Sequence, residues 1–173
     1  MSEPKRVLVT GGAGFIGSHV AAAYLRRGDR VVVLDSLAHG KRENVPEGAE
    51  FVELDIRHDD AARLVREGGF DLVNHHAAQM DVRVSVADPR FDASVNVDGL
   101  LNLVHASHEA GVGRFLFVSS GGVVYGEPEE RPTPEHAAKL PESPYGVTKL
   151  AGEQYLYYYH RVHGMEYAAL RYS

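Results

Sequence analysis

Two residues in the last third of the chain have the types and the spacing to move a proton. Tyr145 and Lys149 lie one helical turn apart near the start of a predicted helix, so their side chains share one face of it. A free tyrosine is a poor base at neutral pH, because its pKa is ~10. The neighbouring ammonium and the positive end of the helix both favour the phenolate, which could then take a proton from an alcohol.

A hydroxyl group from an earlier segment could complete this site. Ser119 and Ser120 follow a predicted strand, residues 114–118, and we place both on the loop at its carboxyl end. Either serine could donate or relay a hydrogen bond to the same substrate oxygen. On its own, Tyr-x-x-x-Lys is common on helices, and a lone tyrosine is more often a half-buried packing residue. The candidate catalytic residues are therefore Ser120, Tyr145 and Lys149, provided that the chain also binds a suitable cofactor.

A glycine-rich turn near the N-terminus predicts that cofactor. Residues 6–17 read RVLVTGGAGFIG, an apolar strand that breaks into glycines and restarts with helical spacing. Gly12, Gly14 and Gly17 satisfy G-x-G-x-x-G, and Gly11 with the last two also fits G-x-x-G-x-x-G. Such a turn lets the backbone approach a pyrophosphate, and the helix that follows directs its N–H groups at the phosphates.

The residues after the turn meet the other requirements of a dinucleotide site. The predicted helix ends at Gly28, and a second apolar strand finishes in Asp35. Asp35 lies close to the offset of about 20 residues at which a carboxylate accepts hydrogen bonds from the adenosine ribose. Because a carboxylate repels a 2′-phosphate, the sequence predicts NAD rather than NADP.

Two further strand ends supply cofactor contacts. Asp55 and Ile56 could contact an adenine, at its amino edge and on its face respectively. Ala77 and its neighbour Ala78 are small enough for a backbone to come close to the cofactor. The predicted cofactor-binding residues are Gly11, Gly14, Phe15, Ile16, Gly17, Asp35, Asp55, Ile56, Ala77, Tyr145 and Lys149.

Strands and helices alternate along the whole chain. We predict strands at residues 7–9, 31–34, 51–54, 71–74, 114–118 and 166–172, and helices at 15–27, 59–67, 91–110 and 144–163. Ser143 is a suitable N-cap for the last helix, and Pro144 suits its first position. Alternation of this kind implies an α/β fold with a doubly wound parallel sheet, the Rossmann fold. We expect six strands in the order 3-2-1-4-5-6 and one domain, residues 1–173.

Composition and charge limit the partners. The chain has 18 basic and 24 acidic residues and no basic run, which argues against nucleic acid or an anionic membrane as partner. No apolar run is long enough for a membrane span and the N-terminus lacks a signal-peptide core, so we expect a cytoplasmic protein. There is no cysteine, and the ten histidines show no ligand spacing, so we predict no metal site.

Taken together, these motifs resemble the extended short-chain dehydrogenase/reductase family, and within it the UDP-glucose 4-epimerases. The resemblance is carried by TGGAGFIGSH, Asp35, Asp55-Ile56, the Val-Ser-Ser…Val-Tyr-Gly element and SPYGVTK, and it extends from Arg6 to the end. It implies an NAD-dependent epimerase that transfers hydride reversibly at C4 of a nucleotide sugar, most simply a UDP-hexose. Tyr145 would be the base, Lys149 would bind the nicotinamide ribose, and Asn96 would be a buried polar residue behind the active site.

Three positions depart from the family pattern. The serine or threonine that usually stands four residues before the tyrosine of Val-Tyr-Gly is replaced by Gly121, so its role falls to Ser120. Met80 stands where many of these epimerases have a lysine near the cofactor. Members of the family continue after Leu-Arg-Tyr into a substrate domain, whereas this sequence stops at Ser173.

Two other functions remain possible from the sequence. A truncated NAD-binding module would hold the cofactor with little or no turnover. A sugar-nucleotide 4,6-dehydratase would have Thr-Asp-Glu before Val-Tyr-Gly, and residues 121–123 lack that acid pair.

The resemblance and the surface of the last helix also predict the oligomeric state. Residues 144–163 carry more aromatic and apolar side chains than one buried face needs. Members of the family dimerise through two long helices, so we expect a homodimer through residues 91–110 and 144–163. The alternative is an aromatic cluster packed wholly inside one subunit.

Overall fold

A six-stranded parallel sheet forms the centre of the computed structural model, which describes residues 3–172. Its strands are β1 (Arg6–Thr10), β2 (Arg30–Asp35), β3 (Glu50–Glu53), β4 (Leu72–His75), β5 (Arg114–Ser120) and β6 (Tyr167–Tyr172). They lie in the order β3-β2-β1-β4-β5-β6, and every neighbouring pair is parallel. The order confirms the predicted doubly wound sheet, and the direction of winding changes between β1 and β4.

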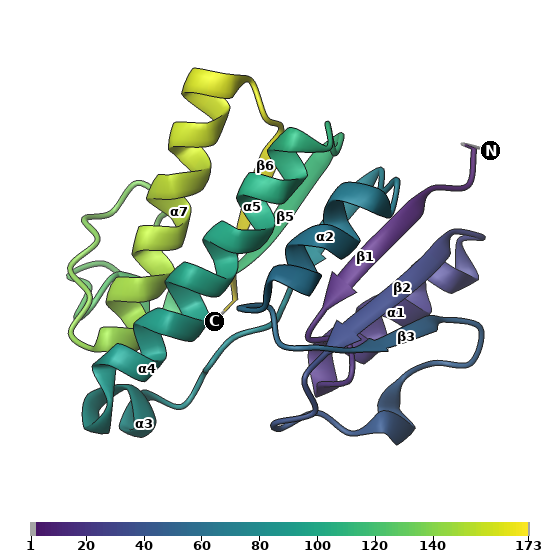
Figure 1. The fold of residues 1–173 in the computed structure, drawn as a ribbon. Helices are drawn as coiled ribbons and strands as arrows, with labels where there is room; N and C mark the ends of the chain where they lie inside the picture. Colours follow the sequence, from purple (N-terminus) through teal and green to yellow (C-terminus); the bar gives the residue numbers. More distant parts are fainter. Residues whose placement is uncertain (1–2, 173) are drawn as a thin grey trace.

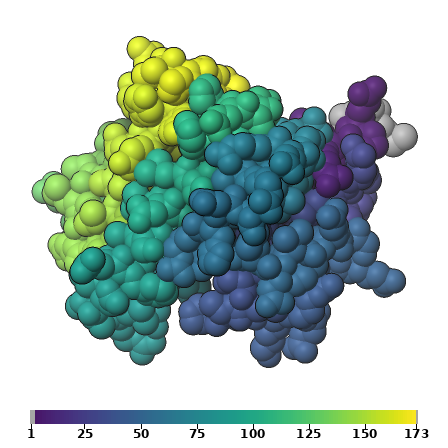
Figure 2. Space-filling model, in the orientation of Figure 1, coloured from purple at the N-terminus to yellow at the C-terminus, as the bar shows by residue number. Residues whose placement is uncertain are grey.

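Helices cover both faces of the sheet. The helical segments are α1 (Phe15–Arg26), η1 (Arg42–Asn44), α2 (Asp59–Glu67), α3 (Val82–Ala87), α4 (Pro89–Ala93), η2 (Ser94–Asp98), α5 (Gly99–Glu109), α6 (Gly121–Val124) and α7 (Pro144–His163). Helices α2, α5 and α7 lie side by side over one face, while α1 covers the other face (Figure 1). In the space-filling view, the N-terminal segments and the C-terminal segments lie on opposite sides of the middle of the chain (Figure 2). None of the helices in residues 3–172 combines the length and the apolar character that crossing a membrane would require.

The two faces of the sheet have separate cores. Leu8 belongs to the larger core, which also contains residues of α2, α5 and α7. Val7 and Val9 belong to the smaller core beneath α1. Because successive side chains of a strand point to opposite faces, a strand with both faces covered needs a continuous apolar run. Burial on both faces therefore explains the continuous run of apolar residues in β1.

Helix α7 begins and ends where the sequence predicts. The hydroxyl of Ser143 accepts a hydrogen bond from the N–H of Gly146 at 3.1 Å, and Gly164 ends the helix with a φ of 72°. Gly152 brings α7 close to its neighbours, since a Cβ there would lie 2.7 Å from Cζ of Phe117 on β5. The close packing places the first turns of α7, with Tyr145 and Lys149, beside the carboxyl end of β5.

Two predictions of local structure are wrong, and two short helices were not predicted. Residues 91–110 do not form one regular α-helix, because η2 is a turn of π-helix between α4 and α5. Residues 119 and 120 belong to β5 rather than to a loop, because β6 pairs with them through Arg171 and Tyr172. The short helices α3 and α6 were not expected from the sequence at all.

Candidate active site

The glycine-rich turn closely approaches two other strands. The N–H of Gly11 donates a 2.8 Å hydrogen bond to the carbonyl of Leu34 at the end of β2. Gly11 has a φ of 68°, and a Cβ on it would lie 2.7 Å from the nitrogen of Ala77 after β4. A Cβ on Gly17 would overlap the carbonyl oxygen of Gly11. Only glycine fits both positions, so the turn is built as the sequence predicts.

Helix α1 begins without a side-chain cap. Gly14 is its N-cap residue, and no side-chain hydrogen bond caps the helix there. The first N–H groups of an α-helix have no partner within the helix, and with the helix dipole they form a site for an anion. The N-terminus of α1 therefore has the open donors that a pyrophosphate requires.

Asp35 joins the glycine-rich turn to the loop that follows β2. One carboxylate oxygen accepts a hydrogen bond from the N–H of Ala13 at 3.0 Å, and the other accepts one from Leu37 at 2.8 Å. Leu37 has a φ of 58°, a left-handed conformation that costs a residue with a Cβ roughly 1–2 kcal/mol. Each oxygen has a second lone pair for a ribose hydroxyl. The two backbone contacts fix the position of the carboxylate beside the glycine-rich turn.

A cavity of about 310 Å³ opens beside this turn. Its lining contains most of the predicted cofactor-binding residues, namely Gly11, Gly14, Phe15, Asp35, Asp55, Ile56 and Ala77. Ile16 and Gly17 do not line it, because they lie further along α1. Tyr145 and Lys149 also lie outside the lining, on α7. The structure therefore brings the predicted adenosine contacts together in one place and puts the catalytic pair beyond them.

Arg57, which no motif in the sequence had indicated, also lines this cavity. Its guanidinium forms an ion pair with Asp55 at 2.6 Å and lies over the ring of Phe91, 5.6 Å from its centroid. The hydrogen bonds from Arg57 lower the pKa of Asp55 and outweigh the opposing effect of burial. An arginine two residues after an aspartate at a strand end was the available signal. The pair gives the cavity a planar cation beside the predicted adenine contacts.

Lys149 lies buried between β5 and Tyr145. Only 3% of the residue is exposed, and its ammonium donates a 2.9 Å hydrogen bond to the carbonyl of Val118. The ammonium also lies 5.7 Å from the centroid of the Tyr145 ring, so the predicted pair shares one site. Burial lowers the pKa of Lys149 to about 8, although the charge of Asp92 opposes this.

The ionisation of Tyr145 differs from the expected direction. Burial raises the pKa of its phenol, and the negative charge of Asp92 raises it further. From the sequence, the neighbouring ammonium and the helix end were predicted to lower this pKa. In the protein alone, desolvation is the larger effect, because water no longer solvates the phenolate.

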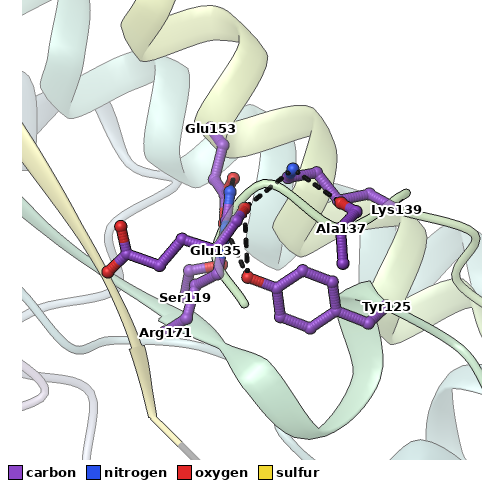
Figure 3. Close-up of polar contacts among 7 residues, drawn as sticks. All are labelled: Ser119, Tyr125, Glu135, Ala137, Lys139, Glu153 and Arg171. Carbon is purple, nitrogen blue, oxygen red and sulfur yellow. Dashed lines mark hydrogen bonds and ion pairs between the residues drawn. The ribbon is translucent and has the colours of Figure 1, made fainter. Parts of the chain in front are cut away.

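The two serines at the end of β5 have different surroundings. The Ser119 hydroxyl is buried and donates a 2.6 Å hydrogen bond to the carboxylate of Glu153 (Figure 3). Ser120 is the next residue of the strand, so its side chain points to the opposite face, and it is partly exposed. The hydroxyl of Ser119 already has a partner, and that of Ser120 is the more accessible.

Glu153 and Arg171 form a polar cluster behind these serines. This cluster was not predicted from the sequence. Arg171 forms an ion pair with Glu153 at 2.7 Å and donates to the phenol oxygen of Tyr125 and the backbone carbonyl of Glu135 (Figure 3). The cluster fixes β6, α7 and the loop between α6 and α7 to one another. Glu153 lies one turn after Lys149 on α7, and that spacing was the only signal in the sequence.

A second buried polar cluster lies around Asn96 in the π-helical turn. Asn96 exchanges two hydrogen bonds with the backbone of Gln79 and donates another to Asp92. The residue is 3% exposed, which confirms the expectation that it is buried and polar. Thr148 completes the cluster from α7, through its hydrogen bond to Asp92.

The residues of this site fit a dinucleotide. The fit rests on glycines that leave no room for a Cβ, on the uncapped start of α1 and on the fixed carboxylate of Asp35. Within residues 3–172, no group of three or more histidine, aspartate and glutamate side chains is arranged to hold a metal ion. Met80, where many family members have a lysine, lies exposed at the cavity.

The sequence and the fold both match known proteins. Residues 7–173 match the NAD dependent epimerase/dehydratase family. The UDP-glucose 4-epimerase of Mycolicibacterium smegmatis is 43% identical over 166 residues, which are 93% of this chain and 53% of that protein. The crystal structure of Thermus thermophilus UDP-glucose 4-epimerase in complex with NAD is 48% identical, with a TM-score of 0.92, and the match covers 96% of this chain and 54% of that one.

A third relative has bound substrate. The crystal structure of Thermotoga maritima UDP-glucose 4-epimerase with UDP-glucose is 42% identical, with a TM-score of 0.93, and the match again covers 96% of this chain and 54% of that one. The chain thus spans about half the length of the relatives that it matches. The family match over nearly the whole chain, together with the glycine-rich turn, shows that this protein belongs to the NAD dependent epimerase/dehydratase family.

Proposed function

We propose that this chain is the cofactor-binding part of an NAD-dependent nucleotide-sugar 4-epimerase of the UDP-glucose/UDP-galactose type. The observation that carries the proposal is the cavity that Gly11, Gly14, Asp35 and Ile56 share. It lies at the carboxyl end of the sheet, where the strand order reverses between β1 and β4. Ligands of open α/β sheets bind at such a point. The relatives named as complexes with NAD and with UDP-glucose support the cofactor and the class of substrate.

The three candidate catalytic residues have distinct roles in this proposal. Tyr145 takes the proton from the C4 hydroxyl of the sugar, and Ser120 donates a hydrogen bond to the same oxygen. Lys149 binds the nicotinamide ribose and favours the Tyr145 phenolate by its charge. When bound, NAD would supply the acceptor for the C4 hydride and a positive charge near the phenol. The hydride then returns to the other face of the sugar, and Tyr145 returns its proton to the C4 oxygen. These two steps give the epimer and restore the starting protonation of Tyr145.

The nucleotide-sugar contacts are proposed to come mainly from a substrate domain that residues 1–173 do not contain. The chain covers 54% of the Thermotoga maritima structure that holds UDP-glucose. In this proposal, residues 1–173 bind NAD and supply the base, and turnover requires a substrate domain in addition.

Replacement of Tyr145 tests the proposal. In a protein in which residues 1–173 are joined to a substrate domain, Tyr145→Phe should reduce epimerisation by about 10²- to 10⁴-fold, the usual contribution of one proton-transfer group. Only the ionisable oxygen is lost, so NAD binding should change little. A coupled assay of UDP-galactose conversion would measure turnover, and calorimetry would measure NAD binding.

Two results would contradict the proposal. Near-normal turnover by Tyr145→Phe would show that another group is the base. Turnover of a different kind, such as loss of water from the sugar nucleotide, would favour the dehydratase instead. Tyr157→Phe is the matched control for loss of a phenol, because Tyr157 is exposed on the same helix and should leave turnover unchanged.

A further inference from the structure

Asp92 is a carboxylate buried next to the candidate catalytic helix. It lies on α4 with none of its surface exposed. Its three hydrogen bonds come from Gln79 at 2.8 Å, Asn96 at 3.1 Å and Thr148 at 2.8 Å. All three donors are neutral. An ionised carboxylate in a protein interior needs an opposite charge nearby as well as hydrogen bonds.

The part of α7 that contacts Asp92 also carries a buried lysine. Thr148, which donates to Asp92, immediately precedes Lys149 in the helix, and both residues are buried. The ammonium of Lys149 donates to the carbonyl of Val118 and lies over two aromatic rings, so its described partners carry no formal negative charge. Asp92 on α4 and Lys149 on α7 thus lie on neighbouring helices, which the hydrogen bond from Thr148 to Asp92 joins.

We propose that Asp92 is a positioning residue for Tyr145 and Lys149, which fixes the first turns of α7 through Thr148 and provides the buried counter-charge for the Lys149 ammonium. The inference rests on the proposed function, because Lys149 must be charged beside Tyr145 only if Tyr145 acts as the base. It adds a residue outside the cofactor cavity and outside the Ser–Tyr–Lys set.

The other titratable side chains near Lys149 do not replace Asp92 as a counter-charge. His75 and His76 follow one another at the end of β4, and burial lowers the pKa of both, to about 4 for His76, so they are neutral at pH 7. Glu153 on α7 is already paired with Arg171. Asp92 alone among these groups supports the charge of Lys149, whose pKa burial has lowered to about 8.

The same charge has an opposite effect on the base. Burial is the main cause of the raised pKa of Tyr145, and the charge of Asp92 raises it further. Asp92 therefore disfavours the Tyr145 phenolate while it favours the Lys149 ammonium. Removal of the charge should therefore lower the titration midpoints of both groups. A purely structural role of Asp92 would change stability and would not move the two midpoints in the same direction.

Lysine NMR on the 173-residue chain tests the proposal. The chain has four lysines, Lys5, Lys41, Lys139 and Lys149. With ¹³C-labelled lysine, the ε-carbon shift follows the protonation of each amine, and the Lys149→Met variant identifies the signal. In the wild type, the Lys149 signal should titrate near pH 8. In Asp92→Asn, the midpoint should fall by about one pH unit or more, as expected for loss of a nearby charge.

Three further variants separate charge from structure. Asp92→Glu keeps the charge and should restore a midpoint close to the wild-type value. Thr148→Val removes the hydrogen bond and keeps the charge, so its midpoint should fall less than that of Asp92→Asn. Asp98→Asn removes an exposed carboxylate from the same helical region and should have no effect.

Either of two results overturns the proposal. One is an unchanged Lys149 midpoint in folded Asp92→Asn, and the other is a shift in Thr148→Val as large as that in Asp92→Asn. If Asp92→Asn does not fold by circular dichroism, Asp92→Ser is the second neutral variant, judged by the same criterion. The titration needs neither sugar nor turnover. Failure of the Asp92 proposal is therefore distinguishable from failure of the proposed function, which the epimerase assay of Tyr145→Phe decides.

Discussion

Ser119 and Ser120 are adjacent in sequence but differ in what their hydroxyls can do. Ser119 donates to Glu153 inside the protein, while Ser120 points to the other face. We expect Ser120→Ala to lower kcat by about 10-fold to 10²-fold, less than loss of the base. Ser119→Ala should instead lower the free energy of unfolding by about 1–3 kcal/mol, because a buried carboxylate loses a hydrogen bond. Turnover and urea unfolding of both variants measure the two effects.

The opposite pattern would reassign the hydroxyl. If Ser119→Ala lost turnover while Ser120→Ala kept it, Ser119 would be the catalytic group, despite its hydrogen bond to Glu153.

At the scale of residues, the sequence predicted the parts of the site that depend on local spacing. The glycines of the turn, Asp35 and the Tyr145–Lys149 pair each follow from a motif within one or two elements. Asp92 and Gln79 could not be found in this way, because their hydrogen bonds depend on how α4, η2 and α7 pack. Their spacing in the sequence contains no pattern for such contacts.

The contact between α7 and β6 gives stability a pH dependence. Burial raises the pKa of Glu153, but the hydrogen bonds from Arg171 and Ser119 outweigh it, so the pKa lies below its ordinary value of 4.5. A lowered pKa stabilises the folded protein above pH 4.5, and this contribution is lost as the pH falls through the folded pKa. We expect Glu153→Gln to lower the free energy of unfolding at pH 7 by about 3 kcal/mol, the lower end for a broken buried pair. The difference from wild type should shrink below pH 4.5.

Urea unfolding of both proteins between pH 7 and pH 3 measures this difference. Glu109→Gln is the matched control, because Glu109 also pairs with an arginine, Arg66, but at the surface. A surface pair contributes little. A Glu153→Gln difference that is the same at pH 7 and pH 3 would contradict the assignment.

Among the elements, the helices with clear end signals were predicted best. Helix α2 has the predicted bounds, and α7 has both the Ser143 cap and the terminal Gly164. The π-helical turn of η2 was not predicted, because the hydrogen bonds of Asn96 within it join residues from separate segments, Gln79 and Thr148. The end of β5 was misplaced because its last pairs depend on β6, a strand that lies far along the chain.

The whole molecule has an exposed stripe on α7. Val147, Tyr155, Tyr158 and Val162 are exposed and recur at helical spacing, whereas Leu156 and Tyr159 are buried in the subunit. The aromatic cluster is therefore only partly internal. We propose that a homodimer forms through this stripe and the neighbouring helical residues 91–110.

Light scattering across a dilution series tests the dimer. The wild-type chain should be a dimer at micromolar concentration, and Tyr155→Glu should be a monomer, because it places a charge in the apolar stripe. Tyr157→Glu is the control, since Tyr157 is also exposed but lies off the stripe. A wild-type chain that stays monomeric at tens of micromolar would contradict this proposal.

The central claim is that the cavity beside the glycine-rich turn binds NAD through Asp35. Calorimetric titration of the 173-residue chain with NAD and with NADP tests it most directly, since it needs neither sugar nor a substrate domain. NAD should bind at least about tenfold more tightly, a difference of ~1.4 kcal/mol, because the fixed carboxylate accepts the ribose hydroxyls and repels a 2′-phosphate. Asp35→Asn should narrow that difference. Equal affinities, tighter binding of NADP, or no binding of either dinucleotide would contradict the account.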